Sequence, residues 1–427
     1  MVWAQQLVFA PAASTPLSNG THPWRRSVIL VSLDGVRPAY LTPELLPHLS
    51  QAPALVAESM RPVSPSLTFP NHWSLLTGVS PGRHGIVAND FHRILRDKSS
   101  EAFFYQDPAR SWNGSWWGAE PLWSVAERAG QSSAVLAWPG PPITSHGERP
   151  RHFQRYVKGW STADRLRTIE RWLDMGSVDE RPSLICAYVP DVDAAAHGAG
   201  PDPSDPSVAA ALRAVDDFIA ALLRSIAARN ASELVDVVVV SDHGMTQTSS
   251  KRLIYLDEAL GAELYGEILT RDGWPSAGLR FKSASAQTAA RDRLRKLAKA
   301  SSFQLLDAEP LAQQWNWTAP DEHVMRERVA PLWMVPDVGW SITTAAEMAT
   351  FSDGVYSPRG NHGYDARHPD MQAIFAAHGP SFRRSAQRIP PFRNLEVHGL
   401  VNELLGIPAR HRPPTEVSHS SLSALQR

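Results

Sequence analysis

The stretch Leu234-Val-Asp-Val-Val-Val-Val240 runs directly into Ser241-Asp242-His243-Gly244. A valine-rich run of this kind is typical of a strand buried on both faces, as in a parallel sheet covered by helices. In open α/β sheets, ligands bind in the crevice outside the carboxyl ends of the strands. A carboxylate and an imidazole are ligands that zinc accepts. The stretch therefore predicts an α/β fold with a metal site at one edge of its sheet.

Apolar runs and amphipathic segments alternate along much of the chain. We expect strands at residues 27–33, 133–138, 184–188 and 371–377, and helices at residues 70–76, 121–130 and 206–229. Alternation of this kind indicates a mostly parallel central sheet flanked by helices on both faces.

The length of 427 residues allows one large α/β domain with insertions. We expect a disordered lead or signal-peptide remnant over 1–26, a catalytic domain over 27–410 and a C-terminal tail over 411–427. Between about 255 and 350 the alternation loosens into a basic helix (288–300) and Trp- and Pro-rich segments, which predicts a cap-like insertion. The basic residues of that helix are typical of a solvated face.

The composition excludes several classes of protein. Lys+Arg 42 against Asp+Glu 43 leaves a net charge of -1, which argues against nucleic acid or an anionic membrane as the main partner. No apolar run approaches the ~20 residues of a transmembrane helix. The single cysteine, Cys186, excludes an internal disulfide and is expected in the core. We expect a monomer.

Four segments match the acceptor pattern for N-glycosylation. They are Asn19-Gly-Thr21, Asn113-Gly-Ser115, Asn230-Ala-Ser232 and Asn316-Trp-Thr318. The apolar N-terminal stretch lacks the basic residues that open a secretory signal, so it is either a signal remnant or a disordered lead. The four acceptor motifs predict a glycoprotein of the secretory pathway, located outside the cell.

Residues of the types that bind metals lie close to the other predicted strands as well. They are Asp34, Asp193, His197 and His362, in addition to Asp242 and His243. A single aspartate after a strand is usually a turn residue or a helix cap. Repetition at four separate points of one sheet edge instead predicts two metal sites, since zinc favours such N and O ligands.

A second group of polar residues surrounds Thr68 in Thr68-Phe-Pro70-Asn-His72. Pro70 suits the first turn of a helix, and Gly78 suits its end. Thr68 could be only the N-cap of that helix. It could also be a nucleophile, because a helix N-terminus favours a developing alkoxide and an incoming phosphate.

Six motifs, taken in order, resemble the nucleotide pyrophosphatase/phosphodiesterase family of the alkaline phosphatase superfamily. They are Asp34-Gly35, Thr68-Phe-Pro-Asn-His72, Trp138-Pro-Gly140, Tyr188 through Asp193 and His197 to Gly200-Pro201, Ser241-Asp-His-Gly-Met245 and Gly360-Asn-His-Gly-Tyr-Asp365. The resemblance covers roughly residues 27 to 408 and implies an alkaline-phosphatase-like fold with two zinc ions. It implies that Asp34, Asp242, His243 and the Thr68 oxygen bind one zinc, and that Asp193, His197 and His362 bind the other.

The resemblance also implies substrate contacts. Asn71 would donate to a phosphate oxygen, Phe69 would lie beside the bound group, and Tyr156 would stack on a nucleobase. Where relatives carry Glu-Pro-Asp-x-x-Gly-His, this chain has two aspartates, Asp191 and Asp193. The spacing to His197 favours Asp193 as the ligand and leaves Asp191 as a turn residue.

These features predict a zinc-dependent phosphodiesterase/nucleotide pyrophosphatase. It would cleave phosphodiester or pyrophosphate bonds of nucleotides through a phosphothreonine intermediate and release a nucleoside 5'-monophosphate. Three carboxylates and a Thr68 alkoxide balance two Zn²⁺, and a nearly neutral site suits a singly charged diester better than a dianionic monoester.

Several alternatives remain open. The same site could act on choline- or lipid-type phosphodiesters, and manganese or iron could occupy its ligands. A sulfatase would need Cys or Ser in place of Thr68. A superfamily mutase is a further alternative. A non-catalytic binding protein would normally have lost some ligands, whereas all seven ligand positions are filled here.

Overall fold

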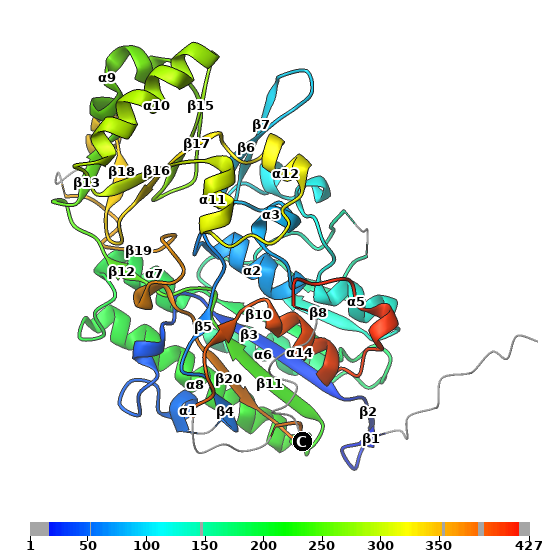
Figure 1. The fold of residues 1–427 in the computed structure, drawn as a ribbon. Helices are drawn as coiled ribbons and strands as arrows, with labels where there is room; N and C mark the ends of the chain where they lie inside the picture. The colour runs from blue at the N-terminus through cyan, green and yellow to red at the C-terminus, as the bar shows by residue number, and fades with distance from the viewer. Residues whose placement is uncertain (1–16, 52, 146–147, 352–354, 383–387, 418–427) are drawn as a thin grey trace, which may run out of the picture.

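The computed structural model describes residues 17–51, 53–145, 148–351, 355–382 and 388–417. Its centre is a seven-stranded sheet in the order β4, β20, β11, β3, β10, β8, β9 (Figure 1). The bounds of these strands are Leu55–Val56, Phe375–His378, Val235–Val240, Ser27–Leu33, Leu184–Val189, Ser133–Leu136 and His152–Gln154. The strands from β11 to β9 are parallel, and β20 is antiparallel to both of its neighbours. The predicted mostly parallel sheet is confirmed.

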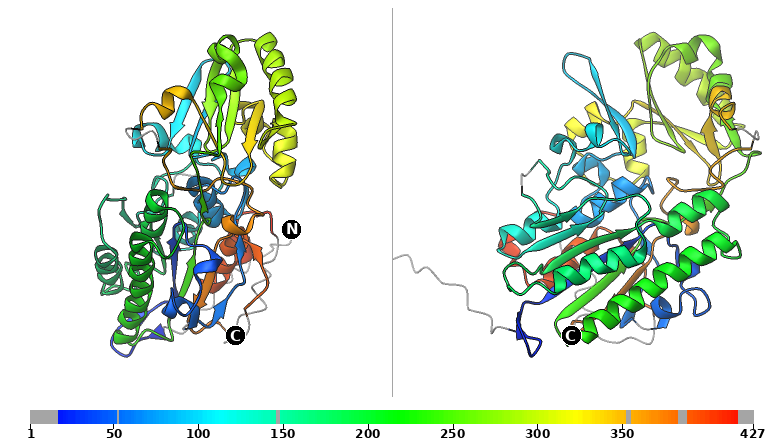
Figure 2. Two further views of the ribbon diagram at one scale, coloured as in Figure 1. Left: turned by 90° about the vertical axis from the view of Figure 1, so that its left-hand side faces the viewer. Right: turned by 180° about the vertical axis from the view of Figure 1, so that it is seen from behind.

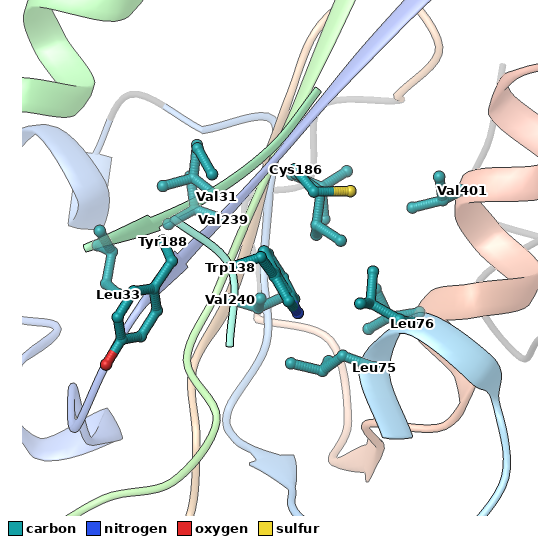
Figure 3. Close-up of a cluster of buried hydrophobic side chains, with 14 of the residues drawn as sticks. Val31, Leu33, Leu75, Leu76, Trp138, Cys186, Tyr188, Val239, Val240 and Val401 are labelled. Carbon is teal, nitrogen blue, oxygen red and sulfur yellow. The ribbon is translucent and has the colours of Figure 1, made fainter. Parts of the chain in front are cut away.

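The three central strands form the most apolar layer of the molecule. Every residue of β3, β10 and β11 is buried, as the valine run predicts. Cys186 lies in β10 and is fully buried, and this burial raises the pKa of its thiol. In Figure 3, Leu76 and Val401 approach the side of the sheet where Cys186 lies. Cys186 is therefore a core residue, as expected.

Helices cover both faces of the sheet (Figure 2). One face carries α6 (Thr162–Leu173), α7 (Asp191–Ala199) and α8 (Pro206–Ala228), and the other carries α2 (Thr68–Thr77), α5 (Leu122–Arg128) and α14 (Glu396–Leu404). The start of α8 follows from its sequence, because the Asp205 side chain accepts from the Ser207 amide and Pro206 occupies the first turn. No helix within the described ranges has the length and apolar character needed to cross a membrane.

The last strand differs from its predicted bounds. It begins at Phe375 instead of Met371, because Pro369–Met371 form a 3-10 turn, η3. It also runs against β11, so the sheet is mixed at this edge.

The N-terminal end differs in part from the predicted disordered lead. Residues 1–16 and 418–427 lie outside the described ranges, but residues 17–26 contain an ordered hairpin of β1 (Leu17–Ser18) and β2 (Pro23–Trp24). The Arg181 guanidinium lies 4.0 Å from the centre of the Trp24 ring and donates to the Pro23 carbonyl at 2.7 Å. The expectation of disorder up to residue 26 is therefore wrong for this hairpin. In the tail, Glu416 accepts from the Ser80 amide at 2.7 Å.

The region predicted as a cap forms a second, smaller layer above the central sheet (Figure 1). An antiparallel sheet in the order β14, β15, β17, β16 spans Ile268–Asp272, Ala277–Phe281, Leu332–Pro336 and Phe303–Asp307. Helices α9 (Leu256–Gly266) and α10 (Ala284–Ala298) pack on it around a separate apolar core. The basic helix begins earlier than predicted, because the Ser283 side chain caps it by accepting from the Ala286 amide.

Shorter elements complete the layer around the cap. They are the hairpin β6 (Asp90–Ile94) and β7 (Ser100–Phe104), the helices α3 (Pro81–His84), α4 (Pro108–Ser111), α11 (Ala308–Gln314), α12 (Glu322–Glu327) and α13 (Ala345–Met348), and the pairs β12 (Thr246–Gln247) with β19 (Gly360–Asn361) and β13 (Leu253–Tyr255) with β18 (Ser341–Thr343).

Candidate active site

The predicted metal ligands follow the ends of four strands. Asp34 comes directly after β3, Asp242 and His243 follow β11, and His362 follows β19. Helix α7 begins just after β10 and carries Asp193 and His197 four residues apart, which places both side chains on one helix face. The ends of β3, β10 and β11 thus place their residues at one edge of the central sheet. His362 reaches the same place from β19, which pairs with β12 outside that sheet.

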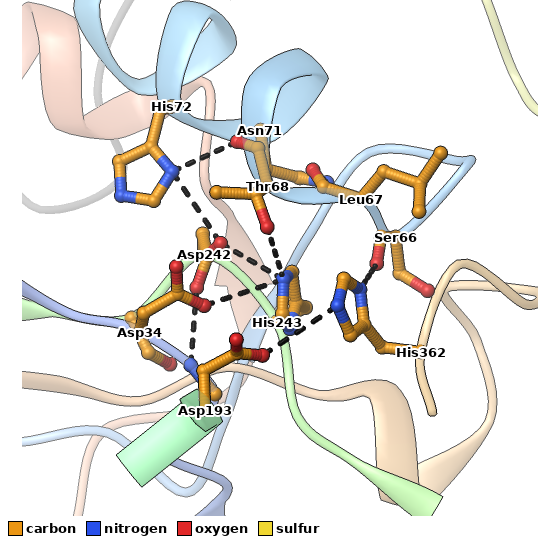
Figure 4. A network of polar contacts seen from close by, with 12 residues as sticks. Asp34, Ser66, Leu67, Thr68, Asn71, His72, Asp193, Asp242, His243 and His362 are labelled. Atoms are coloured by element: carbon orange, nitrogen blue, oxygen red, sulfur yellow. Dashed lines mark hydrogen bonds and ion pairs between the residues drawn. The ribbon is translucent and has the colours of Figure 1, made fainter. Parts of the chain in front are cut away.

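One cluster surrounds the His243 Nε2 atom (Figure 4). This nitrogen lies 2.9 Å from Asp242 Oδ2, 3.4 Å from Asp34 Oδ1 and 3.2 Å from Thr68 Oγ1. All four side chains are buried. These are the four residues predicted to share one zinc ion.

A second cluster surrounds the Asp193 carboxylate. Its Oδ1 lies 3.4 Å from His197 Nε2 and 3.5 Å from His362 Nε2, and the two nitrogens are 3.2 Å apart. The His197 Nδ1 atom faces the Gly360 carbonyl at 2.8 Å, and the His362 Nδ1 atom faces the Ser66 carbonyl at 3.0 Å. An Nδ1–H that donates to a carbonyl leaves the Nε2 lone pair directed at the cluster, as a metal-binding histidine requires.

The two clusters adjoin each other. The rings of His243 and His362 stack with centroids 3.6 Å apart. The ligand atoms of Asp34, Asp193 and His243 also lie within 4.8 Å of one another, so Asp193 lies between the clusters. Asp191, the rejected alternative, instead has its Oδ2 3.6 Å from Arg165 Nη1.

The arrangement of lone pairs fits cations. His243 Nδ1 faces the Gly244 carbonyl at 2.9 Å, so its Nε2 lone pair also points toward carboxylate oxygens. The buried Asp34 Oδ1 and Asp193 Oδ1 accept no hydrogen bond from the described residues. Lone pairs that face lone pairs in a buried site repel unless a positive ion lies between them. The N/O donor set suits zinc, and manganese or iron as well.

The pKa values of Asp34 and His362 reflect this crowding of like groups. Despite their burial, Asp242 and His243 instead favour each other's charged forms, so the pKa of Asp242 is lowered and that of His243 is raised. Burial raises the pKa of Asp34 well above its ordinary value, and the charges of Asp242 and Asp193 raise it further. Burial and the neighbouring His243 lower the pKa of His362. A bound divalent cation would favour the ionised carboxylates and neutral imidazoles.

Thr68 is the first residue of α2, and its side chain makes no capping bond. The N-cap position belongs to Leu67, so the alternative in which Thr68 serves as the N-cap is wrong. Its Oγ1 instead faces His243 at the N-terminus of a ten-residue helix. Unpaired amides at such a terminus favour negative charge, which suits a hydroxyl that loses its proton.

The predicted phosphate contact of Asn71 is wrong. Its side chain is fully buried, and its Nδ2 donates to the carbonyls of Pro65 at 3.1 Å and Leu67 at 2.9 Å. Its Oδ1 accepts from the Val63 amide at 2.7 Å and from Asn394 Nδ2 at 3.0 Å. With its amide used in this way, Asn71 holds the loop before Thr68 and has no donor left for a ligand.

Asn89 is a polar residue of the site that the sequence motifs did not indicate. Its Oδ1 accepts from the Phe69 amide at 3.0 Å, which places Asn89 at the N-terminus of α2. Its half-buried side chain has an Nδ2 that donates to no acceptor among the described residues. No local signal marks Asn89, because only the fold brings it beside the helix.

Aromatic side chains border the site. The half-buried Phe69 ring packs edge-on against Tyr105, with centroids 5.3 Å apart. Tyr156 is 48% exposed, and its ring centroid lies 6.5 Å from that of Tyr188. The Tyr188 hydroxyl in turn donates to Asp34 Oδ2 at 2.5 Å. Tyr156 is therefore near the clusters, and its stacking on a base stays a prediction.

The chain matches known proteins over most of its length. Residues 28–365 match the family described as type I phosphodiesterase / nucleotide pyrophosphatase. An uncharacterized pyrophosphatase/phosphodiesterase of Schizosaccharomyces pombe is 34% identical over 418 residues, which cover 94% of this chain and 81% of the yeast protein. Family member 3 of the ectonucleotide pyrophosphatase/phosphodiesterases of Rattus norvegicus is 30% identical, and the match covers 93% of this chain. The chain spans only 44% of that rat protein.

The fold is that of a solved relative. The structure of an inactive variant of murine ectonucleotide pyrophosphatase/phosphodiesterase 5, in complex with AMP, has a TM-score of 0.81 and 27% identity. The match covers 94% of this chain and all of the murine one. The predicted alkaline-phosphatase-like α/β fold is thereby confirmed, and the chain belongs to the type I phosphodiesterase/nucleotide pyrophosphatase family.

Proposed function

We propose that this protein is a two-metal hydrolase that cleaves phosphodiester or pyrophosphate bonds of nucleotides and releases nucleoside 5'-monophosphates. The observation that carries the proposal is the position of Thr68. Its hydroxyl stands at a helix N-terminus and lies 3.2 Å from His243 Nε2, where Asp34 and Asp242 also converge. AMP in the complex of the murine relative supports a nucleotide as the substrate class.

The residues that would hold the metals follow the two clusters. Asp34, Asp242, His243 and Thr68 would hold one zinc ion, and Asp193, His197 and His362 the other. Two such ions, when bound, stabilise the attacking and leaving oxygens of an in-line displacement. The unpaired carboxylate oxygens of Asp34 and Asp193 support this assignment.

Thr68 would act as the nucleophile. Its Oγ1 attacks phosphorus as the bond from phosphorus to the leaving oxygen breaks, which gives a phosphothreonine. Water then attacks the same phosphorus, the bond to Oγ1 breaks, and the monophosphate is released. The N-terminus of α2 favours the charge on the phosphoryl oxygens throughout.

Asn89 would bind a phosphoryl oxygen in the role first assigned to Asn71. Its Nδ2 is free among the described residues, and its Oδ1 is held by the Phe69 amide, one residue from the nucleophile. A fixed donor of this kind stabilises negative charge that develops in a transition state. Neither the two clusters nor the Thr68–His72 motif contains an arginine or lysine, which favours a singly charged diester over a dianionic monoester.

The aromatic border suits a planar base, with Phe69 and Tyr156 as the contacts. Aromatic faces also attract quaternary ammonium groups, which keeps choline-bearing diesters as the second candidate. The names of the mammalian relatives, together with the four glycosylation motifs, support a secreted or extracellular glycoprotein. We infer that it acts as a monomer on a small-molecule substrate.

A substrate panel on the metal-loaded protein tests the proposal. It comprises a nitrophenyl ester of a nucleoside monophosphate, bis-nitrophenyl phosphate, nitrophenyl-phosphorylcholine and nitrophenyl phosphate. We expect the highest kcat/KM on the nucleoside ester. Preference for the choline ester would move the assignment to the second candidate, and preference for the monoester would overturn the diesterase proposal.

A further inference from the structure

The four glycosylation motifs are not equivalent in the folded protein. Two of the asparagines use their side-chain amides to join distant segments, and the other two present free amides to solvent. Glycosylation forms a bond from Nδ2 to a sugar C1 as the bond between that carbon and a lipid pyrophosphate breaks, and Nδ2 loses one proton. A buried Nδ2 has no room for a glycan. An Nδ2 whose hydrogen bond joins two segments must give up or share that contact, because the sugar replaces one of its two hydrogens.

Asn19 and Asn230 belong to the first group. The Asn19 side chain is only 8% exposed, and its Nδ2 donates to the Arg229 carbonyl at 2.8 Å. Its Oδ1 accepts from the backbone amides of Thr21 and His22. Asn230 is exposed, but its Nδ2 donates to the Asn19 carbonyl at 2.7 Å, so a glycan there would compete with this contact. The two amides thus pin the β1–β2 hairpin to the end of α8.

Asn113 and Asn316 belong to the second group. Asn113 is exposed between α4 and the 3-10 turn η2 (Gly114–Trp116), and only its Oδ1 is used, by the Ser115 amide. Asn316 is exposed just after α11, and its side chain makes no hydrogen bond to the described residues. The hydroxyl-bearing residues two positions later, Ser115 and Thr318, are exposed as well.

Buried tryptophans fix the two loops so that these asparagines face outward. After Asn113, the Trp117 indole is fully buried and donates to the Ser111 carbonyl at 2.6 Å. After Asn316, the buried Trp317 indole donates to the Ser64 carbonyl at 2.8 Å. A glycan on either loop would therefore extend into solvent without displacing the chain.

We propose that the secreted protein carries N-linked glycans on Asn113 and Asn316 and none on Asn19 and Asn230. The inference rests on the proposed secretory location and not on the proposed hydrolysis. A chain modified at Asn19 could not form the hairpin as it stands, because the glycan would occupy the place of the Arg229 carbonyl.

Mass spectrometry tests the assignment independently of activity. The full chain would be secreted from eukaryotic cells behind a heterologous leader and treated with peptide N-glycosidase in ¹⁸O-water. We expect ¹⁸O-labelled aspartate at positions 113 and 316 and unmodified asparagine at positions 19 and 230. Label at position 19 or 230, or its absence from position 113 or 316, would overturn the proposal.

Single variants provide the control. Asn113→Gln and Asn316→Gln should each reduce the mass of the secreted protein by one glycan. Asn19→Gln should leave the glycan mass unchanged and lower the unfolding temperature, because the hairpin loses its anchor. Loss of one glycan mass in Asn19→Gln would contradict the assignment. This holds even if the variant folds poorly, because the glycan mass is measured on the protein that is secreted.

Discussion

His72 lies beside Asp242, with its Nδ1 3.4 Å from Asp242 Oδ2, and both side chains are fully buried. The same Nδ1 lies 2.8 Å from the Thr68 carbonyl (Figure 4). The His72 Nε2 atom lies 2.8 Å from Ser32 Oγ. One imidazole thus joins the first turn of α2 to the end of β11. This imidazole therefore helps to fix the position of the Thr68 hydroxyl relative to the Asp242 carboxylate.

Replacing His72 with phenylalanine should weaken the site without unfolding the protein. The ring keeps its packing against Trp138 and Tyr188 but loses its polar contacts. Partners of metal ligands typically contribute about 10–100-fold to metal affinity or activity, and we expect a loss of that size. Calorimetric zinc titration and kcat measure it. His398→Phe, at a buried position outside the two metal clusters, should leave zinc affinity unchanged; an equal loss in both variants would contradict the role of His72.

Removal of the Thr68 hydroxyl should abolish turnover. Thr68→Ala should lose at least about 10³-fold in kcat, since no other group replaces the nucleophile. Zinc content should remain, because three protein ligands of that cluster are unchanged. Thr68→Ser should keep measurable activity and trap ³²P from a labelled substrate in acid-quenched protein. Near-normal activity of the alanine variant would refute the nucleophile assignment.

Asn89 and Asn71 make a matched pair of variants. Asn89→Ala should lower kcat by about 10²–10³-fold, as loss of one oxyanion donor does. It should lower the free energy of unfolding less than Asn71→Ala does, because only the Phe69 amide loses a partner. Asn71→Ala should instead lower that free energy by about 1–3 kcal/mol or more, because buried backbone groups lose their partners. Urea unfolding and kinetics at a saturating substrate concentration separate the two effects. A loss of kcat in Asn71→Ala, together with a loss of stability in Asn89→Ala, would instead assign the phosphate contact to Asn71.

Metal removal should destabilise the protein as well as inactivate it. Without cations the buried carboxylates and imidazole lone pairs face one another uncompensated. A ligand present at about 1,000 times its Kd stabilises the folded state by about 4 kcal/mol. Calorimetric scans before and after chelation, and after zinc is returned, should show a reversible fall in Tm. An unchanged Tm would mean that these residues hold no tightly bound metal.

Acid should destabilise the fold through two buried histidines that belong to neither of the two clusters. Burial lowers the pKa of His84 and of His398 to about 3, against about 6.5 in the unfolded chain. The unfolded state then binds more protons between these values, so stability is full above about pH 6.5 and falls as the pH drops toward 3. At pH 5 the loss is about 2 kcal/mol per histidine.

The matched variants for this test are His84→Gln and His323→Gln. The free energy of unfolding in urea would be compared at about pH 7.5 and pH 5. The difference between the two pH values should shrink by about 2 kcal/mol in His84→Gln. It should stay unchanged in His323→Gln, because His323 is exposed. Equal pH dependence in all three proteins would show that His84 does not contribute.

The sequence alone determined the central strands and the residues at their ends. Apolar runs such as residues 235–240 can be buried only in a covered sheet, and the groups that follow parallel strands meet at one edge. The pattern of residues is therefore sufficient to group Asp34, Asp193 and Asp242 with His197 and His243, whereas His362 follows β19, which lies outside the central sheet. The resemblance of the motifs implied how these residues divide into two sites. The contacts agree with that division, because Thr68 lies beside His243 and His362 lies beside Asp193.

Only the tertiary structure decided what each side-chain amide does. Asn71 stands in the nucleophile motif but bonds to backbone groups four to eight residues before it, whereas Asn89 reaches the same helix through a loop without a motif. Asn19 and Asn316 carry equivalent acceptor motifs, yet one is buried against α8 and the other is exposed. The partners of an amide are backbone groups placed by the whole fold, and a local pattern of residues does not record them.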